Sequence, residues 1–221
     1  MGIKENLKKI KEQIGNHKVK IIAVTKYATQ EQIAEAYKLD ICDFGESYIQ
    51  DAIPKLNRFT QEENPEKKIR WHFIGRLQNN KVRFAIENFH LIHSVSSVEL
   101  ANLISKTAAN RGITQSVLLQ VNISQEASKA GLSSFELNSS FEDIIKLPNI
   151  DVKGLMTIAP KTADINIIKD CFNKLYVLKE ELNKKYMANL KELSMGMTND
   201  YKEAIECKAT MIRIGKGIFN E

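Results

Sequence analysis

The feature that most constrains the fold is an alternation of short apolar runs with segments of helical period along the whole chain. Runs such as "VKIIAVT" and "SVLLQVNI" are rich in branched aliphatic residues, which is typical of strands buried on both faces. The segments between them, such as "TQEQIAEAYKL", place apolar residues three and four positions apart, as an amphipathic helix does. The expected strands are 19–25, 41–44, 69–74, 90–95, 116–123, 150–158, 190–195 and 211–214.

This alternation predicts an α/β fold, a single (β/α)8 TIM barrel, because each strand is followed by a helix. A doubly wound open sheet is the alternative. That fold usually carries a glycine-rich turn after its first strand, and "VTKYATQ" has no glycine. No linker or low-complexity stretch interrupts the chain, so we expect one domain over 1–221, with a short helix over 1–16 before the first strand.

Composition excludes several classes of protein. No apolar run approaches the roughly 20 residues of a membrane span, and the charged N-terminus has no secretory signal pattern. The three cysteines are widely spaced without histidines at ligand spacing, which predicts no metal site and a reduced, cytoplasmic setting. The net charge is +5, but lysines alternate with glutamates, as in "KKIKEQ", so neither nucleic acid nor membrane is an expected partner.

In a barrel of this type, functional residues lie at the C-terminal ends of the strands. Small, polar and cationic residues recur at these ends, which predicts a pocket for a polar, anionic small molecule. The candidates are Lys26, Ser47, His72, Asn122, Met156, Ser194, Gly196, Thr198, Arg213, Gly215 and Lys216.

Three of these residues have competing interpretations. Lys26 ends an apolar run, either as a solvated side chain or as a pocket amine that attacks carbonyls. His72 lies between Trp71 and Phe73, where a hydrogen-bonded core histidine is an equal alternative. Arg213 lies inside an apolar strand, where an unpaired guanidinium would be costly, so it requires an acceptor.

The segments "SMGM" and "RIGKG" suit a phosphate, since hydroxyls and backbone N–H groups of a glycine turn bind such anions. A lysine opposite a phosphate site is one known way to hold pyridoxal phosphate. On the residues alone, an aldolase that forms an imine on its lysine remains a close alternative.

Nine blocks in order carry a more specific resemblance: "AVTK", "FGES", "WHFIGRLQNNK", "HSV", "VNIS", "SKAG", "GLMTI", "LSMGMTND" and "RIGKGIF". With these blocks the chain resembles the pyridoxal phosphate homeostasis protein family over almost its whole length. The resemblance implies a fold type III barrel, like the N-terminal domain of alanine racemase, which binds pyridoxal 5'-phosphate.

The resemblance also implies roles for individual residues. Lys26 would hold the cofactor as a Schiff base, and Arg213 would face the pyridine nitrogen and keep it unprotonated. Asn122 and Met156 would line the ring, and His72 would lie at the barrel mouth. The residues that map onto the family's phosphate-binding segments are Ser194, Gly196, Thr198, Gly215 and Lys216. Lys129 maps onto a lysine that would act as a secondary aldehyde acceptor.

This chain departs from the family pattern at several positions. Ser47 follows "FGE" where the family usually has asparagine, and Ser96 replaces the usual aspartate of "HSVD". Lys216 stands where a small hydroxyl residue is typical, and the ending "IFNE" lacks the usual glycine and arginine. We expect cofactor binding to survive, with altered phosphate contacts.

The resemblance implies a protein that buffers or delivers the cofactor to apo-enzymes without established turnover, so no catalytic residue is assigned. We expect a monomer, with a dimer as the alternative. A low-activity amino-acid racemase or lyase, with His72 or a tyrosine as second base, is the alternative function, and a cofactor-free interaction scaffold is a third. The sequence ends at Glu221, just after the last expected strand, which leaves no length for the second domain of alanine racemase.

Overall fold

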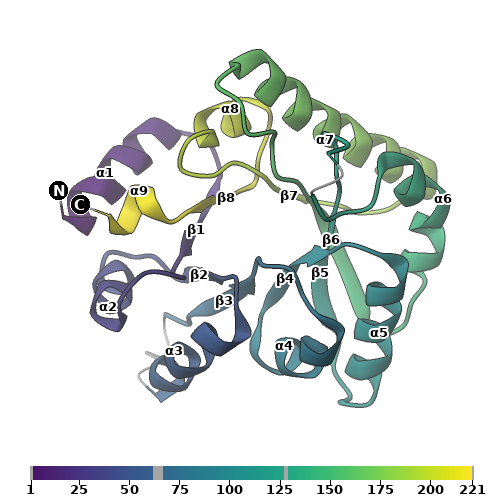
Figure 1. Cartoon of the computed structure of the whole chain (residues 1–221), viewed down its shortest axis with the longest axis horizontal. Helices are drawn as coiled ribbons and strands as arrows, with labels where there is room; N and C mark the ends of the chain where they lie inside the picture. Colours follow the sequence, from purple (N-terminus) through teal and green to yellow (C-terminus); the bar gives the residue numbers. More distant parts are fainter. Residues whose placement is uncertain (1, 62–66, 127–128, 221) are drawn as a thin grey trace.

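Eight parallel strands close into a barrel in the computed structural model, which describes residues 2–61, 67–126 and 129–220 (Figure 1). Each strand pairs with its neighbours in chain order, and β1 closes the barrel by pairing with β8. The strands are β1 (Lys20–Val24), β2 (Asp43–Glu46), β3 (Arg70–Phe73), β4 (Leu91–Val95), β5 (Gln115–Gln120), β6 (Ile150–Met156), β7 (Glu192–Ser194) and β8 (Met211–Ile214). This topology confirms the predicted (β/α)8 barrel and excludes the open sheet.

Helices surround the barrel as an outer ring (Figure 1). They are α1 (Ile3–Ile14), α2 (Gln30–Lys38), α3 (Ile49–Gln61), the 3-10 helix η1 (Asn79–Lys81), α4 (Val82–Asn88), α5 (Val98–Ala109), α6 (Ser134–Ile145), α7 (Ile165–Tyr186), α8 (Tyr201–Glu206) and α9 (Lys216–Phe219). Thr29 caps the start of α2, because its side chain accepts a hydrogen bond from the backbone N–H of Gln32. The expected N-terminal helix is α1.

Helix α1 lies beside α9, so the two ends of the described chain meet (Figure 1). The Asn6 side chain donates hydrogen bonds to the backbone carbonyls of Ile218 (3.1 Å) and Asn220 (3.3 Å). The buried side chains of α1 recur every three or four positions, and each contributes roughly 1.5–3 kcal/mol by leaving water. These residues are Ile3, Leu7, Ile10 and Ile14.

Strand β2 lies two residues beyond the expected 41–44. Ile41 is buried, but its backbone N–H donates to the carbonyl of Ala36 at the end of α2 instead of joining the sheet. Gly45 and Glu46, whose residue types disfavour strands, complete β2 because they pair with His72 and Phe73 of β3.

The barrel interior has an apolar part and a polar part. The apolar part is a small cluster formed by Ile22, Leu91, Leu118, Met156 and Met211. The polar part is a row of hydrogen-bonded side chains that crosses the interior and is described below. Such a row is unusual for a packed barrel core, because buried polar groups are costly unless they are hydrogen-bonded.

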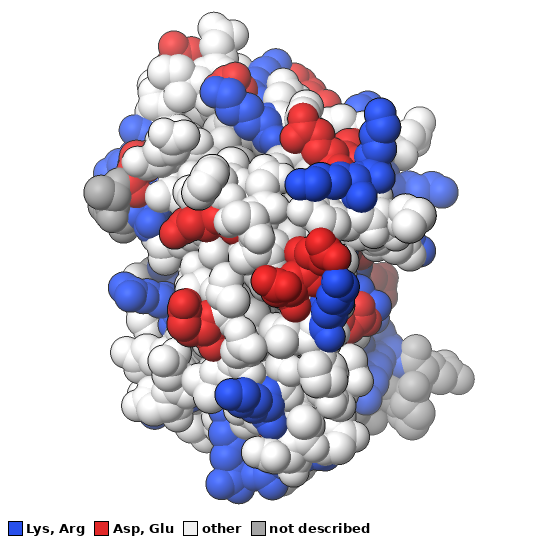
Figure 2. Space-filling model, turned by 90° about the vertical axis from the view of Figure 1, so that its right-hand side faces the viewer, with Lys and Arg blue, Asp and Glu red and all other residues white. Residues whose placement is uncertain are grey.

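Acidic and basic side chains lie next to one another in several places on the face shown in Figure 2, and uncharged residues cover most of it. None of the helices within the described residues is long and apolar enough to cross a membrane. Within the same residues, no group of three or more His, Cys, Asp or Glu side chains is arranged to hold a metal ion.

Candidate functional site

A cleft of about 380 Å³ opens at the C-terminal ends of the strands, above β1, β2 and β8. This volume lies within the roughly 300–1,000 Å³ of small-molecule sites. The lining residues are Val24, Lys26, Tyr27, Ala28, Ser47, Ile74, Ile158, Met197, Thr198, Arg213, Gly215, Lys216, Phe219 and Asn220. The lining therefore combines apolar side chains with three cationic side chains and several hydroxyls.

Lys26 lies just beyond the end of β1 and is half-buried at the cleft. Its Nζ lies 4.7 Å from the centroid of the Tyr27 ring. Within the part of the chain that the structure describes, this amine makes no hydrogen bond or ion pair. It is therefore available to react with or bind a ligand in the cleft.

Arg213 enters the cleft from inside the barrel on β8 and is only 4% exposed. Its Nη1 donates to Ser194 Oγ (2.6 Å) and its Nη2 donates to the Thr157 carbonyl (2.9 Å). These acceptors confirm the prediction that a guanidinium inside this strand needs partners. Burial lowers the pKa of Arg213 to about 10, and the charge of Asp200 opposes that shift.

The Arg213 guanidinium can donate more hydrogen bonds than it makes to the described residues. Only two of its five N–H groups have partners, and no carboxylate among the described residues lies within ion-pair distance of it. A buried cation without a carboxylate partner favours a ligand that offers lone pairs or negative charge.

The turn after β7 places Thr198 at the cleft. Gly196 has φ of +87°, and a Cβ on it would lie 2.5 Å from Ala204 Cβ, so only glycine fits this turn. Asp200 Oδ1 accepts the backbone N–H of Met197 (2.5 Å). The Thr198 hydroxyl accepts the backbone N–H of Gly217 in α9 (3.3 Å), which joins the two glycine-containing segments predicted to bind phosphate.

Of the residues expected at the site, some line the cleft and some do not. Those that line it are Lys26, Ser47, Thr198, Arg213, Gly215 and Lys216. Ser194 and Gly196 support it from below, since Ser194 accepts a hydrogen bond from Arg213 and the Gly196 carbonyl accepts the Arg213 backbone N–H (2.9 Å). Met156 is buried in the apolar cluster of the barrel interior.

His72 is not at the barrel mouth, so that expectation is wrong. It is 1% exposed and lies within β3, where its Nε2 is 2.9 Å from an oxygen of Asp43 at the start of β2. His72 lies one residue before the last residue of β3, and Arg213, which lines the cleft, lies one residue before the last residue of β8, so position along the strand does not separate the two.

Asn122 and Lys129 hold a loop together next to the cleft. The Asn122 amide donates to the carbonyls of Glu126 (2.9 Å) and Lys129 (3.3 Å). The Lys129 amine donates to Glu126 Oε1 (2.7 Å) and to the carbonyl of Ala159 (2.9 Å). Because these contacts occupy the amine, the structure gives Lys129 a structural role.

A row of buried side chains connects Arg213 to the opposite end of the barrel. Ser194 Oγ lies 2.8 Å from His93 Nδ1, and His93 Nε2 lies 2.9 Å from His72 Nδ1. His72 Nε2 contacts Asp43 Oδ1 at 2.9 Å. Asp43 is in turn bound by Arg70, through Nε at 2.8 Å and Nη2 at 2.6 Å. Four strands besides β8 contribute to this row, and the sequence did not predict that the two histidines meet.

A buried ion pair between Glu46 and Lys55 lies next to the cleft, between the barrel and its helix layer. Glu46 is fully buried, and its Oε1 accepts hydrogen bonds from Lys55 Nζ and Thr25 Oγ1, both at 2.6 Å. Lys55 also donates to the Thr25 carbonyl at 2.6 Å. Lys55 therefore fixes the backbone directly before Lys26.

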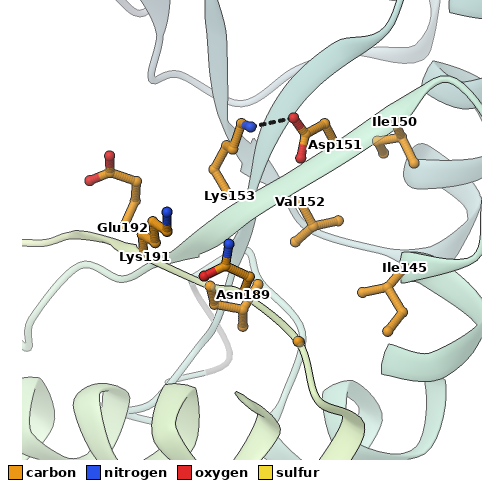
Figure 3. A pocket seen from close by; sticks show the side chains of 10 residues that line it. Ile145, Ile150, Asp151, Val152, Lys153, Asn189, Lys191 and Glu192 are labelled. Atoms are coloured by element: carbon orange, nitrogen blue, oxygen red, sulfur yellow. Dashed lines mark ion pairs between the residues drawn. The ribbon is translucent and has the colours of Figure 1, made fainter.

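Of the cavities outside the cleft, two bear on the choice of site. The first, of about 1,040 Å³, adjoins the cleft, shares Ser47 with the cleft and is lined by the "GRLQNNK" segment. The other, of about 460 Å³, lies at the opposite end of the barrel where β6 and β7 begin (Figure 3). There Lys153 forms an ion pair with Asp151 (Figure 3). That cavity lies at the barrel end which in such folds serves stability, so we assign it no ligand.

Sequence reasoning missed the apolar wall of the cleft. Ile74 and Ile158 follow β3 and β6 by one and two residues. Tyr27 follows Lys26 and is 75% exposed. Position was the available signal, because Ile74 and Ile158 close the expected strands 69–74 and 150–158, but the residues expected at the site were polar or small, with Met156 the exception.

Comparison with known proteins gives a consistent result. The family described as "Alanine racemase, N-terminal domain" matches residues 2–221. The chain is 38% identical to the pyridoxal phosphate homeostasis protein of Aquifex aeolicus (strain VF5) over 94% of this chain and 89% of that protein. It is 38% identical to the protein of the same name from Vibrio alginolyticus, over 91% of this chain and 85% of that one.

Solved structures agree. PipY of Synechococcus elongatus PCC7942, whose structure has PLP bound, superimposes with a TM-score of 0.90 and 32% identity, over 99% of this chain and 100% of that one. Alanine racemase of Clostridium difficile 630 is 15% identical with a TM-score of 0.82 and shares the fold over 56% of its length. The chain belongs to the alanine racemase N-terminal domain family and, within it, to the pyridoxal phosphate homeostasis proteins.

Proposed function

We propose that this protein binds pyridoxal 5'-phosphate in the cleft, covalently through Lys26, and takes part in keeping the cellular supply of that cofactor in balance. One observation carries the proposal: a lysine amine without a hydrogen bond or ion pair to the described residues and a buried arginine with N–H groups that these residues leave unused share one cleft of about 380 Å³. The family relatives named for this role support it.

The residues of the cleft fit the cofactor. When bound, pyridoxal phosphate supplies an aldehyde, which condenses with a neutral primary amine to give an imine and water. Lys26 offers the amine, and Arg213 offers N–H groups to the pyridine nitrogen. Thr198 and Lys216 offer a hydroxyl and an exposed ammonium to the phosphate. Ile74 and Ile158, which line the cleft, would exclude water from a bound cofactor.

The composition of the cleft lining supports a non-catalytic role. Amino-acid racemisation needs a second base on the far side of the ring. Among the described residues that line the cleft there is no histidine, aspartate or glutamate. His72 is buried in the barrel interior, and Tyr27 is the remaining candidate. The relatives are named as homeostasis proteins, which also supports a carrier. Delivery to apo-enzymes in the cytoplasm, by a monomer, belongs to the same proposal.

The test is a visible absorbance spectrum of the purified protein mixed with pyridoxal 5'-phosphate, followed by borohydride reduction and peptide mass mapping. We expect an imine band and a reduced adduct on Lys26. Lys26→Arg keeps the charge but cannot form the imine, and it should give neither. Lys184→Arg on α7 is the matched control and should leave both unchanged.

Two results would contradict the proposal. Absence of an imine band at saturating cofactor would remove the cofactor assignment. An adduct that maps to Lys129 or Lys216 would remove the assignment to Lys26. Incubation with a panel of amino acids decides between carrier and enzyme, since racemisation that disappears in Lys26→Arg would show an enzyme.

A further inference from the structure

We propose that His72 and His93 are positioning residues that orient Arg213 from inside the barrel, through a hydrogen-bond relay with one fixed direction from Asp43 to Ser194. This inference rests on the proposed function in one respect only: the ligand that Arg213 meets is taken to be the cofactor. The relay itself follows from the side chains of the barrel interior.

The direction of the relay is determined by its two ends. The ionised carboxylate of Asp43 only accepts hydrogen bonds, so His72 Nε2 carries a hydrogen and donates to it. A neutral imidazole has one donor and one acceptor, so His72 Nδ1 accepts from His93 Nε2. By the same rule His93 Nδ1 accepts from the Ser194 hydroxyl. The Ser194 oxygen then accepts from Arg213, which has only donors.

This arrangement satisfies every polar atom in the row in one way. Both histidines have the hydrogen on Nε2, and the hydroxyl of Ser194 points toward His93. Reversing any one bond would set two N–H groups against each other or leave a buried nitrogen without a partner, which is costly in a core. The relay therefore runs between a group that only accepts hydrogen bonds, the Asp43 carboxylate, and a group that only donates them, the Arg213 guanidinium.

The surroundings favour neutral histidines. Burial lowers the pKa of His93 well below its usual value, and the nearby groups His72, Arg213, Lys20 and His90 act in the same direction. Burial also lowers the pKa of His72; the carboxylate of Asp43 opposes this, while Lys20 and Arg70 add to it. A second cation next to Arg213 would repel it, so a neutral relay is consistent with a charged guanidinium.

The consequence for the cleft is geometric. The relay fixes the Ser194 oxygen, and that oxygen together with the Thr157 carbonyl fixes two N–H groups of Arg213. The remaining N–H groups of a planar guanidinium are then fixed as well, and Arg213 is a lining residue of the cleft. His72 lies out of reach of a ligand in the cleft, yet it contributes to the orientation of the group that meets one.

The first experiment uses wild-type protein without cofactor. Nitrogen-15 NMR of the histidine rings reports which nitrogen carries the hydrogen. We expect His72 and His93 to be neutral and protonated on Nε2 at pH 7. A hydrogen on Nδ1 of either ring would overturn the proposal, and this measurement needs neither a variant nor the cofactor.

The second experiment compares two variants. In His72→Phe, His93 loses its acceptor, so we expect its hydrogen to move to Nδ1 and the dissociation constant of the imine to rise about fivefold to tenfold, the effect of one lost hydrogen bond. His72→Gln restores one donor and one acceptor. It should return the His93 tautomer and the dissociation constant of the imine to near their wild-type state. Ser94→Ala removes a buried hydroxyl on β4 that makes no hydrogen bond, and serves as the control.

The outcomes separate the two proposals. If wild-type protein forms the imine and His72→Phe matches Ser94→Ala in spectrum and dissociation constant, the relay is refuted and the proposed function stands. If wild-type protein forms no imine, the proposed function fails, and the relay is judged by the histidine tautomers and by the Arg213 N–H resonances in His72→Phe. Should His72→Phe not fold, the wild-type tautomers and His72→Gln decide.

Discussion

Removing Lys55 should destabilise this barrel more than any other single change to a charged side chain on its helix layer. In Lys55→Met the carboxylate of Glu46, which is 0% exposed, keeps only the hydroxyl of Thr25 as a donor. Breaking a buried ion pair by removing one partner costs about 3–5 kcal/mol, because an uncompensated charge stays in the core. Glu46→Gln should cost less, about 1–3 kcal/mol, because Lys55 keeps the Thr25 carbonyl and lies closer to the surface.

The assay is urea unfolding followed by circular dichroism. With an m-value of about 3 kcal/mol/M, a loss of about 3–5 kcal/mol moves the midpoint down by about 1–1.7 M. The double variant Glu46→Gln/Lys55→Met removes both charges, so it should be more stable than the sum of the single effects predicts, by about 1.5 kcal/mol or more. If Lys55→Met lowers the free energy of unfolding by less than about 1 kcal/mol, the assignment of a buried ion pair is refuted. Strict additivity of the two single effects in the double variant would refute it as well.

Two further predictions follow from the cleft and the relay. A Cβ on Gly75 would lie 2.0 Å from the backbone oxygen of Ser47, so Gly75→Ala should displace the Ser47 segment and weaken cofactor binding; equilibrium titration measures this, and unchanged affinity would contradict it. In the folded state the pKa values of His72 and His93 lie below the usual 6.5. The unfolded state therefore binds more protons than the folded state near this pH. The free energy of unfolding should fall as the pH drops below about 6.5. The double variant His72→Gln/His93→Gln should reduce that slope in urea titrations between pH 5 and 7, and an unchanged slope would contradict the assignment.

The sequence predicts the chemistry of the cleft because position along each strand is readable from the apolar runs. Lys26, Thr198 and Lys216 follow such runs closely, and in a parallel barrel all such positions meet at one face. Arg213 could be recognised as a group that needs acceptors, because its flanking residues Ile212 and Ile214 belong to the strand. To predict these residues, only the local sequence pattern and the chemistry of their side chains are needed.

The depth of a residue inside the barrel could not be read in the same way. Alternation in "RWHF" indicates that His72 points inward, but how far down it lies depends on the stagger between β2, β3 and β4. The pairing of Glu46 with Lys55 is equally hidden, because it depends on how α3 packs against β2. Long-range geometry decides both, and no local pattern encodes it.

The closure of β1 onto β8 also has a consequence for folding. Lys26 follows the first strand and Arg213 lies in the last, so the two halves of the cleft come from opposite ends of the barrel sequence and meet only when the ring of strands is complete. A ligand that bridges them binds only the closed barrel and therefore stabilises the β1–β8 seam by mass action. Hydrogen exchange along Ile22 and Ile212 should slow when the ligand is present, so occupancy of the cleft would report that the chain has finished folding.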